Sequence, residues 1–213
     1  PKPSSAASDV YKRQAVYMTN TMNKKSQLAK LLATENIEVQ ENKVQTASFD
    51  VVNRILTIPI FKDEHKSDNV YDMLVGHEVS HALHTPADSW KEMAQRSKEF
   101  KMFVNVIEDA RIDKLIQKKY PGLTNDYLKG FDKMYKDNFF GTKGKDLSQY
   151  ALIDKINLYY KSSKRMNFNF TPKEMILVNA VDKCKTFDDV LKLSEEILGL
   201  SLIHISEPTR PRL

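Results

Sequence analysis

Two histidines and a glutamate in the segment Val75–Leu83 have the types and the spacing that could hold a metal ion and hydrolyse a bond. His77 and His81 are four residues apart, so on an α-helix they lie on one face, one turn apart. Two imidazoles in that arrangement can reach one tetrahedral zinc ion. Glu78 projects about 100° further round the helix, where its carboxylate can take a proton from a water at an open position of the ion. The segment therefore predicts a Zn²⁺ site with Glu78 as the general base.

The residues around this HExxH motif are typical of a buried metal helix. Apart from His77, Glu78 and His81, all residues from Val75 to Leu83 are uncharged, and none is proline. Ser67 or Asp68 could cap the start of the helix, and Thr85-Pro86 should end it. The alternative is a helix with two structural histidines and no metal.

A third ligand is expected from a second helix, at Glu108. On a helix, Val104, Ile112 and Leu115 all fall within about 40° of Glu108, so this carboxylate belongs to an otherwise apolar stripe. A buried carboxylate needs a partner, and a metal ion is a natural one. The alternative, an exposed glutamate, would require the whole face to be solvated.

Two further histidines are not expected to bind the ion. His84 shares a stripe with His77 and His81, but it lies about 10.5 Å from His77 along the axis, too far for a common ligand set. We predict that it is a neighbour of the site or faces solvent. His65 lies in a polar loop and is expected to be solvated.

The second helix should be interrupted before it reaches the site. A helix running unbroken from Asp88 would place Glu108 about 30 Å from its start, whereas His81 lies only about 5 Å from the end of its own helix. We therefore predict a break between about residues 95 and 101, with Trp90 before the break packing against the metal helix.

The rest of the chain predicts a small antiparallel sheet followed by helices, an α+β fold. The segments near 46–51 and 54–60 are expected to form a hairpin. Pro59 of the second strand has no N–H to donate to a neighbouring strand, so this strand should lie at an edge or end there. An edge beside the motif could hold a peptide as an added strand, or the hairpin could simply cover the core. The expected strands are near 36–40, 46–51 and 54–60, and the expected helices are near 19–33, 125–138, 147–162, 172–182 and 187–198.

The two motifs together resemble a known family. HEVSHALH at 77–84 and NVIEDARID at 105–113 are similar to the gluzincin branch of the zincin metallopeptidases, and more closely to phage-encoded peptidases related to the T subunit of cobaltochelatase. The resemblance covers about residues 45–120. It implies a zincin-like fold, zinc as the cofactor, a peptide or protein substrate, and the host cytoplasm as the location. It also implies that His77, His81 and Glu108 are the metal ligands and that Glu78 is the general base.

The same resemblance suggests which residues support the ligands. Gluzincins carry an aspartate four residues after the ligand glutamate, but Ile112 occupies that position here. The acids near that position are Asp109 and Asp113, either of which could orient a ligand histidine, with Asp109 as the first choice. Asn105 and His84 are further candidate neighbours. A tyrosine of the later helices could stabilise an oxyanion.

The organisation of the chain suggests one metal-binding domain over 15–120 and a helical subdomain over 121–200. Residues 1–14 and 201–213 resemble translated sequencing adapters, and their net charges of +2 and +1 leave +2 of the total +5 for residues 15–200. Nucleic acid is therefore an unexpected partner, and no apolar run is long enough to span a membrane. A von Willebrand A-type domain, often found in such relatives, could be missing from this fragment. The alternative function is a non-catalytic, zinc-stabilised assembly module of a chelatase-like or phage complex.

Overall fold

The computed structural model of this chain describes residues 37–44, 46–60 and 67–206. The helix expected near 19–33, His65 and most of the two terminal stretches lie outside these residues.

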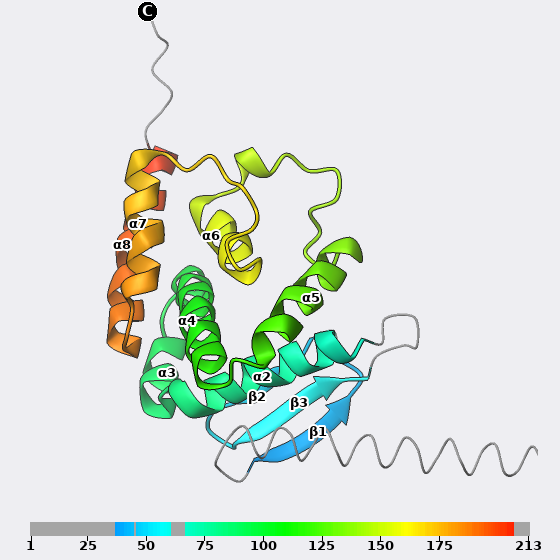
Figure 1. The fold of residues 1–213 in the computed structure, drawn as a ribbon. Helices are drawn as coiled ribbons and strands as arrows, with labels where there is room; N and C mark the ends of the chain where they lie inside the picture. The colour runs from blue at the N-terminus through cyan, green and yellow to red at the C-terminus, as the bar shows by residue number, and fades with distance from the viewer. Residues whose placement is uncertain (1–36, 45, 61–66, 207–213) are drawn as a thin grey trace, which may run out of the picture.

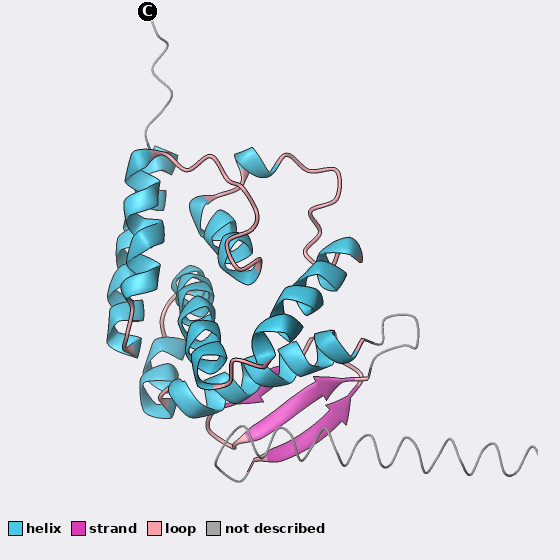
Figure 2. Ribbon diagram, viewed as in Figure 1, coloured by secondary structure: helices cyan, strands magenta, loops and turns pink. Residues whose placement is uncertain are grey.

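The described residues form a small sheet followed by helices, the mixed α and β architecture expected from the sequence (Figures 1 and 2). The strands are β1 (Glu38–Asn42), β2 (Ser48–Asp50) and β3 (Ile55–Pro59). The helices are α2 (Asp68–His84), α3 (Ala87–Ala94), α4 (Lys98–Lys119), α5 (Leu123–Lys136), α6 (Leu152–Lys161), α7 (Pro172–Lys183) and α8 (Phe187–Ser206), with a 3₁₀ turn at Leu147–Gln149.

The sheet is mixed, so the expectation of an antiparallel sheet was wrong for one strand. The strand order is β1-β3-β2, with β3 antiparallel to β2 but parallel to β1. Strand β3 lies in the centre because it is the most apolar of the three, with Leu56 and Ile58 fully buried. Strand β2 is short, with only three residues. Pro59 therefore ends a central strand, and the described sheet has β2 at the edge.

Helix α2 carries the HExxH motif across one face of the sheet (Figure 1). The Ser67 side chain accepts a hydrogen bond from the backbone N–H of Val70 and caps the start of the helix. The helix ends at His84 with Thr85 as its C-terminal cap, as predicted. Helix α5 packs closely along α2. A Cβ atom at Gly130 of α5 would lie only 2.9 Å from the sulfur of Met73 on α2, so glycine at this position lets the two helices approach.

The predicted break before the second helix is confirmed. Helix α3 ends at Ala94, and α4 begins after Ser97, whose side chain accepts the backbone N–H of Phe100. Trp90 of α3 meets the His81 ring edge-on at 6.2 Å. Helices α5 and α7 lie close to the predicted ranges, and Thr171 and Glu174 form the expected capping box at the start of α7. Helix α6 begins later than predicted, at Leu152, and α8 continues past the predicted end at 198 to Ser206, into the stretch set apart as a tail.

Helix α4 joins two apolar cores. Its first half, including Phe100 and Val104, packs with α6, α7 and α8, whereas Ile116 packs with the sheet, α2 and α5. Helix α4 therefore contributes side chains to both cores. None of the described helices combines the length and the apolar character needed to cross a membrane.

Candidate metal centre

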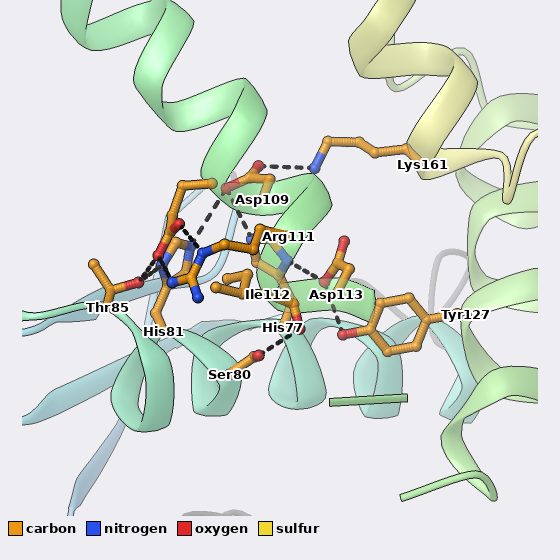
Figure 3. A network of polar contacts seen from close by, with 11 residues as sticks. His77, Ser80, His81, Thr85, Asp109, Arg111, Ile112, Asp113, Tyr127 and Lys161 are labelled. Carbon is orange, nitrogen blue, oxygen red and sulfur yellow. Dashed lines mark hydrogen bonds and ion pairs between the residues drawn. The ribbon is translucent and has the colours of Figure 1, made fainter. Parts of the chain in front are cut away.

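Three donor atoms from α2 and α4 converge where the two helices cross (Figure 3). Oδ1 of Asp109 lies 3.6 Å from Nε2 of His77 and 3.4 Å from Nε2 of His81. Tetrahedral zinc with bonds of about 2.0–2.1 Å sets neighbouring ligand atoms roughly 3.3–3.4 Å apart. The two distances to Asp109 are therefore close to what one metal ion requires, and all three donor atoms lie within 4.8 Å of one another.

The opposite nitrogen of each imidazole is held by a hydrogen bond that leaves Nε2 free. Nδ1 of His77 lies 2.7 Å from a carboxylate oxygen of Asp113, so Nδ1–H donates there. The Thr85 hydroxyl donates its only proton to Glu108, so it accepts from Nδ1–H of His81 at 3.0 Å. These hydrogen bonds place the proton of each neutral ring on Nδ1, so the neutral form of each ring presents a lone pair on Nε2, which is the form that binds a metal.

Asp109 has one oxygen held by a cation and one without a hydrogen bond. Oδ2 accepts from the Lys161 ammonium at 3.0 Å, whereas the buried Oδ1 has no hydrogen-bond partner. Burial alone would raise the pKa of Asp109, but Lys161 and the two histidines hold that pKa well below its usual range. A buried, ionised oxygen facing two imidazole nitrogens fits a metal ion, because an unpaired buried polar atom is otherwise costly.

Glu108, predicted as the third ligand, is not part of this cluster of donor atoms. Glu108 is fully buried, as its apolar stripe indicated. Its two oxygens, however, accept from Nε and Nη2 of Arg111, both at 2.7 Å, and one of them also accepts from Thr85. The partner of this carboxylate is thus an arginine one turn away, and the donor atom that α4 contributes to the cluster belongs to the adjacent Asp109.

The other expected neighbours lie at the edges of the site. Asn105 is one turn before Asp109 on α4 and lines the cavity beside the cluster. His84 is outside the cluster of donor atoms; its backbone oxygen accepts from Arg111, and its buried Nε2 has no partner. Of the tyrosines considered for an oxyanion, Tyr127 lines the cavity, where its hydroxyl donates to Asp113.

A cavity of about 370 Å³ opens over the three donor atoms. Glu78 lines it together with His77, His81 and Asp109. Burial raises the pKa of Glu78 above its ordinary value, the direction that makes a carboxylate a better proton acceptor near neutral pH. The edge strand β2 contributes Ser48 to the wall of the same cavity.

Charged neighbours also determine the protonation of His77 in the metal-free protein. Burial alone would lower the pKa of His77, but the carboxylates of Asp113 and Asp109 outweigh that effect and raise it to about 9. At neutral pH this ring therefore carries a proton that a metal ion would displace.

Two residues of the site were not singled out from the sequence as functional. Lys161 reaches Asp109 from α6, 52 positions away in the chain, and no short-range pattern marks it. Thr85 was assigned only to the end of the helix. Asp113 was the alternative to Asp109 for orienting a histidine, and it is Asp113 that contacts Nδ1 of His77.

Comparison of the chain with family models, with curated proteins and with solved structures finds no match. The chemistry of this site is therefore argued from its own residues.

Proposed function

We propose that this protein is a zinc-dependent hydrolase that cleaves peptide bonds, with His77, His81 and Asp109 as the metal ligands and Glu78 as the general base. One observation carries the proposal: the donor atoms of two histidines and one aspartate converge at the wall of a cavity, and the buried carboxylate of Glu78 lines the same cavity. Catalytic zinc sites have three protein ligands and an open position, whereas structural sites close with four.

The donor set supports zinc chemistry of the hydrolytic kind. Two imidazoles and one carboxylate also bind Fe(II) in oxygenases, but Glu78, next to His77 in the chain, provides the base that hydrolysis needs. When bound, zinc would supply Lewis-acid polarisation of the carbonyl and of a water molecule.

The protein's own residues would manage the proton. Glu78 would accept it from the water that attacks the carbonyl carbon and return it to the leaving nitrogen as the C–N bond breaks. Asp113 and Thr85 would keep both ligand rings oriented throughout. The β2 edge supports a peptide as the substrate, since an extended chain can add to such an edge.

Metal analysis combined with one variant tests this proposal. We expect about one zinc per purified chain, hydrolysis of an unstructured protein such as casein, and loss of that hydrolysis on removal of the metal with a chelator. The substitution Glu78→Gln should abolish hydrolysis and retain zinc. Zinc without hydrolysis in the unmodified protein would instead favour the non-catalytic, zinc-stabilised module.

A further inference from the structure

The cavity over the candidate metal centre has a charged end and an apolar end. All six ionisable side chains of its wall other than tyrosine belong to the charged end: His77, Glu78, His81, Asp109, Asp113 and Lys161. Met73 and Leu74 line the cavity one helical turn before His77 on α2. Phe131 likewise follows Tyr127 by one turn on α5. Both helices therefore change from polar to apolar in the same direction along the cavity.

Aromatic rings and the β2 strand enclose the apolar end. Phe131 and Phe140 stack with ring centroids 5.3 Å apart, and Phe139 meets Phe140 edge-on at 5.4 Å. Phe49 and Ala47 contribute from β2 and the residue before it. Phe139 remains half exposed at the rim, although aromatic rings are usually covered, so an apolar partner would remove it from water.

We propose that this apolar end, lined by Ala47, Phe49, Met73, Phe131, Phe139 and Phe140, receives a large apolar side chain of the peptide substrate, with aromatic residues preferred. The inference rests on the proposed function, because the charged end must hold the bond that is cleaved. A peptide lying along β2 projects its side chains alternately to the two faces. One such side chain could enter the apolar end while the neighbouring peptide bond lies at the donor atoms.

Binding can be measured separately from hydrolysis. The chain has a single tryptophan, and Trp90 lines the same cavity, so its fluorescence reports on an occupant. Zinc-loaded protein with Glu78→Gln would be titrated with acetylated, amidated pentapeptides Ala-Ala-X-Ala-Ala, in which X is Phe, Leu, Ala or Asp. We expect the Phe peptide to bind roughly 10–100-fold more tightly than the Ala peptide, the gain typical of burying one such side chain, and the Asp peptide to bind most weakly.

Two variants locate the preference. Phe139→Ser removes the aromatic rim, and Ala47→Leu fills the apolar end from the β2 side. In each variant the affinity for the Phe peptide should exceed that for the Ala peptide by no more than about threefold, which is less than the gain from burying a single methyl group. Ile176→Ser is the matched control, because Ile176 is an exposed apolar residue of α7 that does not line the cavity, and it should leave the ratio unchanged.

The outcomes separate this inference from the proposed function. Equal binding of all four peptides, binding of none, or a Phe preference that survives both variants would overturn the apolar subsite. Hydrolysis of these peptides by zinc-loaded protein with Glu78 intact, without preference for Phe, would sink the subsite alone. Preferential binding of the Phe peptide with no hydrolysis by that protein would sink the proposed function and leave the subsite standing.

Discussion

Glu108 and Asp109 are consecutive carboxylates on α4, and their surroundings differ in a way that separates stability from binding. Glu108 is buried against Arg111 and Thr85, and both of its oxygens accept hydrogen bonds. Asp109 faces the two histidines across the cavity, with one oxygen that accepts none. The first arrangement is complete without any ligand, whereas in the second the buried Oδ1 of Asp109 has no hydrogen-bond partner.

The comparison teaches that burial of an acidic residue does not by itself identify a metal ligand. Glu108 is the more deeply buried of the two, yet its charge is matched by an arginine within the same helix. The better candidate for a ligand is Asp109, the carboxylate whose partners leave one oxygen without a hydrogen bond. Thr85 connects the two regions, because its hydroxyl donates to Glu108 and accepts from His81.

The largest effect on stability is expected from Glu108→Gln. Breaking a buried ion pair on one side leaves Arg111 uncompensated and costs roughly 3–5 kcal/mol. Urea unfolding of the metal-free protein measures this loss. Glu195→Gln is the matched control, since its pair with Arg96 is exposed and should contribute about 1 kcal/mol or less. Equal losses in the two variants would show that Glu108 is not the buried partner described.

The link between the two regions is tested by Thr85→Val. This change keeps the side-chain shape but removes the acceptor for Nδ1–H of His81. Loss of such an outer partner typically lowers metal affinity roughly 10–100-fold, and competition with a chromophoric chelator measures it. An unchanged zinc affinity would mean that Thr85 does not orient the ring.

The metal-binding region should also respond to pH through His77. Because the pKa of this ring is raised to about 9 in the metal-free protein, zinc must displace one proton at lower pH. Affinity should rise by up to about tenfold per pH unit from pH 7 toward pH 9 and then level off. The proton on His77 stabilises the metal-free fold fully below about pH 6.5, and that contribution is lost as pH rises through about 9. A pH-independent zinc affinity over this range would contradict the assignment.

The smallest effect is expected from Ser80→Ala. The Ser80 hydroxyl donates to the backbone oxygen of Ile112 at 2.7 Å and joins α2 to α4 without touching either carboxylate. Its loss should lower the free energy of unfolding by about 0.5–1.5 kcal/mol and leave zinc affinity unchanged. A fall in affinity comparable with that of Thr85→Val would show that both hydroxyls act only through helix packing.

Sequence reasoning reached most of the fold because its signals are local. The caps at Ser67 and Thr171, the break before Ser97 and the helical spacing of His77 and His81 depend on residues a few positions apart. The parallel pairing of β1 with β3 was missed because strand order depends on which strand is buried most deeply, a property of the whole sheet.

The site shows the same limit more sharply. The periodicity of α4 correctly placed Glu108 inside, but consecutive residues differ by only about 100°. Which of two adjacent carboxylates faces the two histidines depends on how α4 is rotated by its packing against α6 and α8. The pairing of Lys161 with Asp109 depends on the same long-range packing, so neither could be obtained from spacing alone.

The most direct test of the central claim is a zinc titration of three proteins side by side: wild type, Asp109→Asn and Glu108→Gln. The account predicts that Asp109→Asn loses more affinity than the roughly 10–100-fold caused by removing an outer partner. Glu108→Gln, studied where it remains folded, should stay within that range of the wild type. Wild-type affinity in Asp109→Asn, with loss of zinc binding in folded Glu108→Gln, would contradict it.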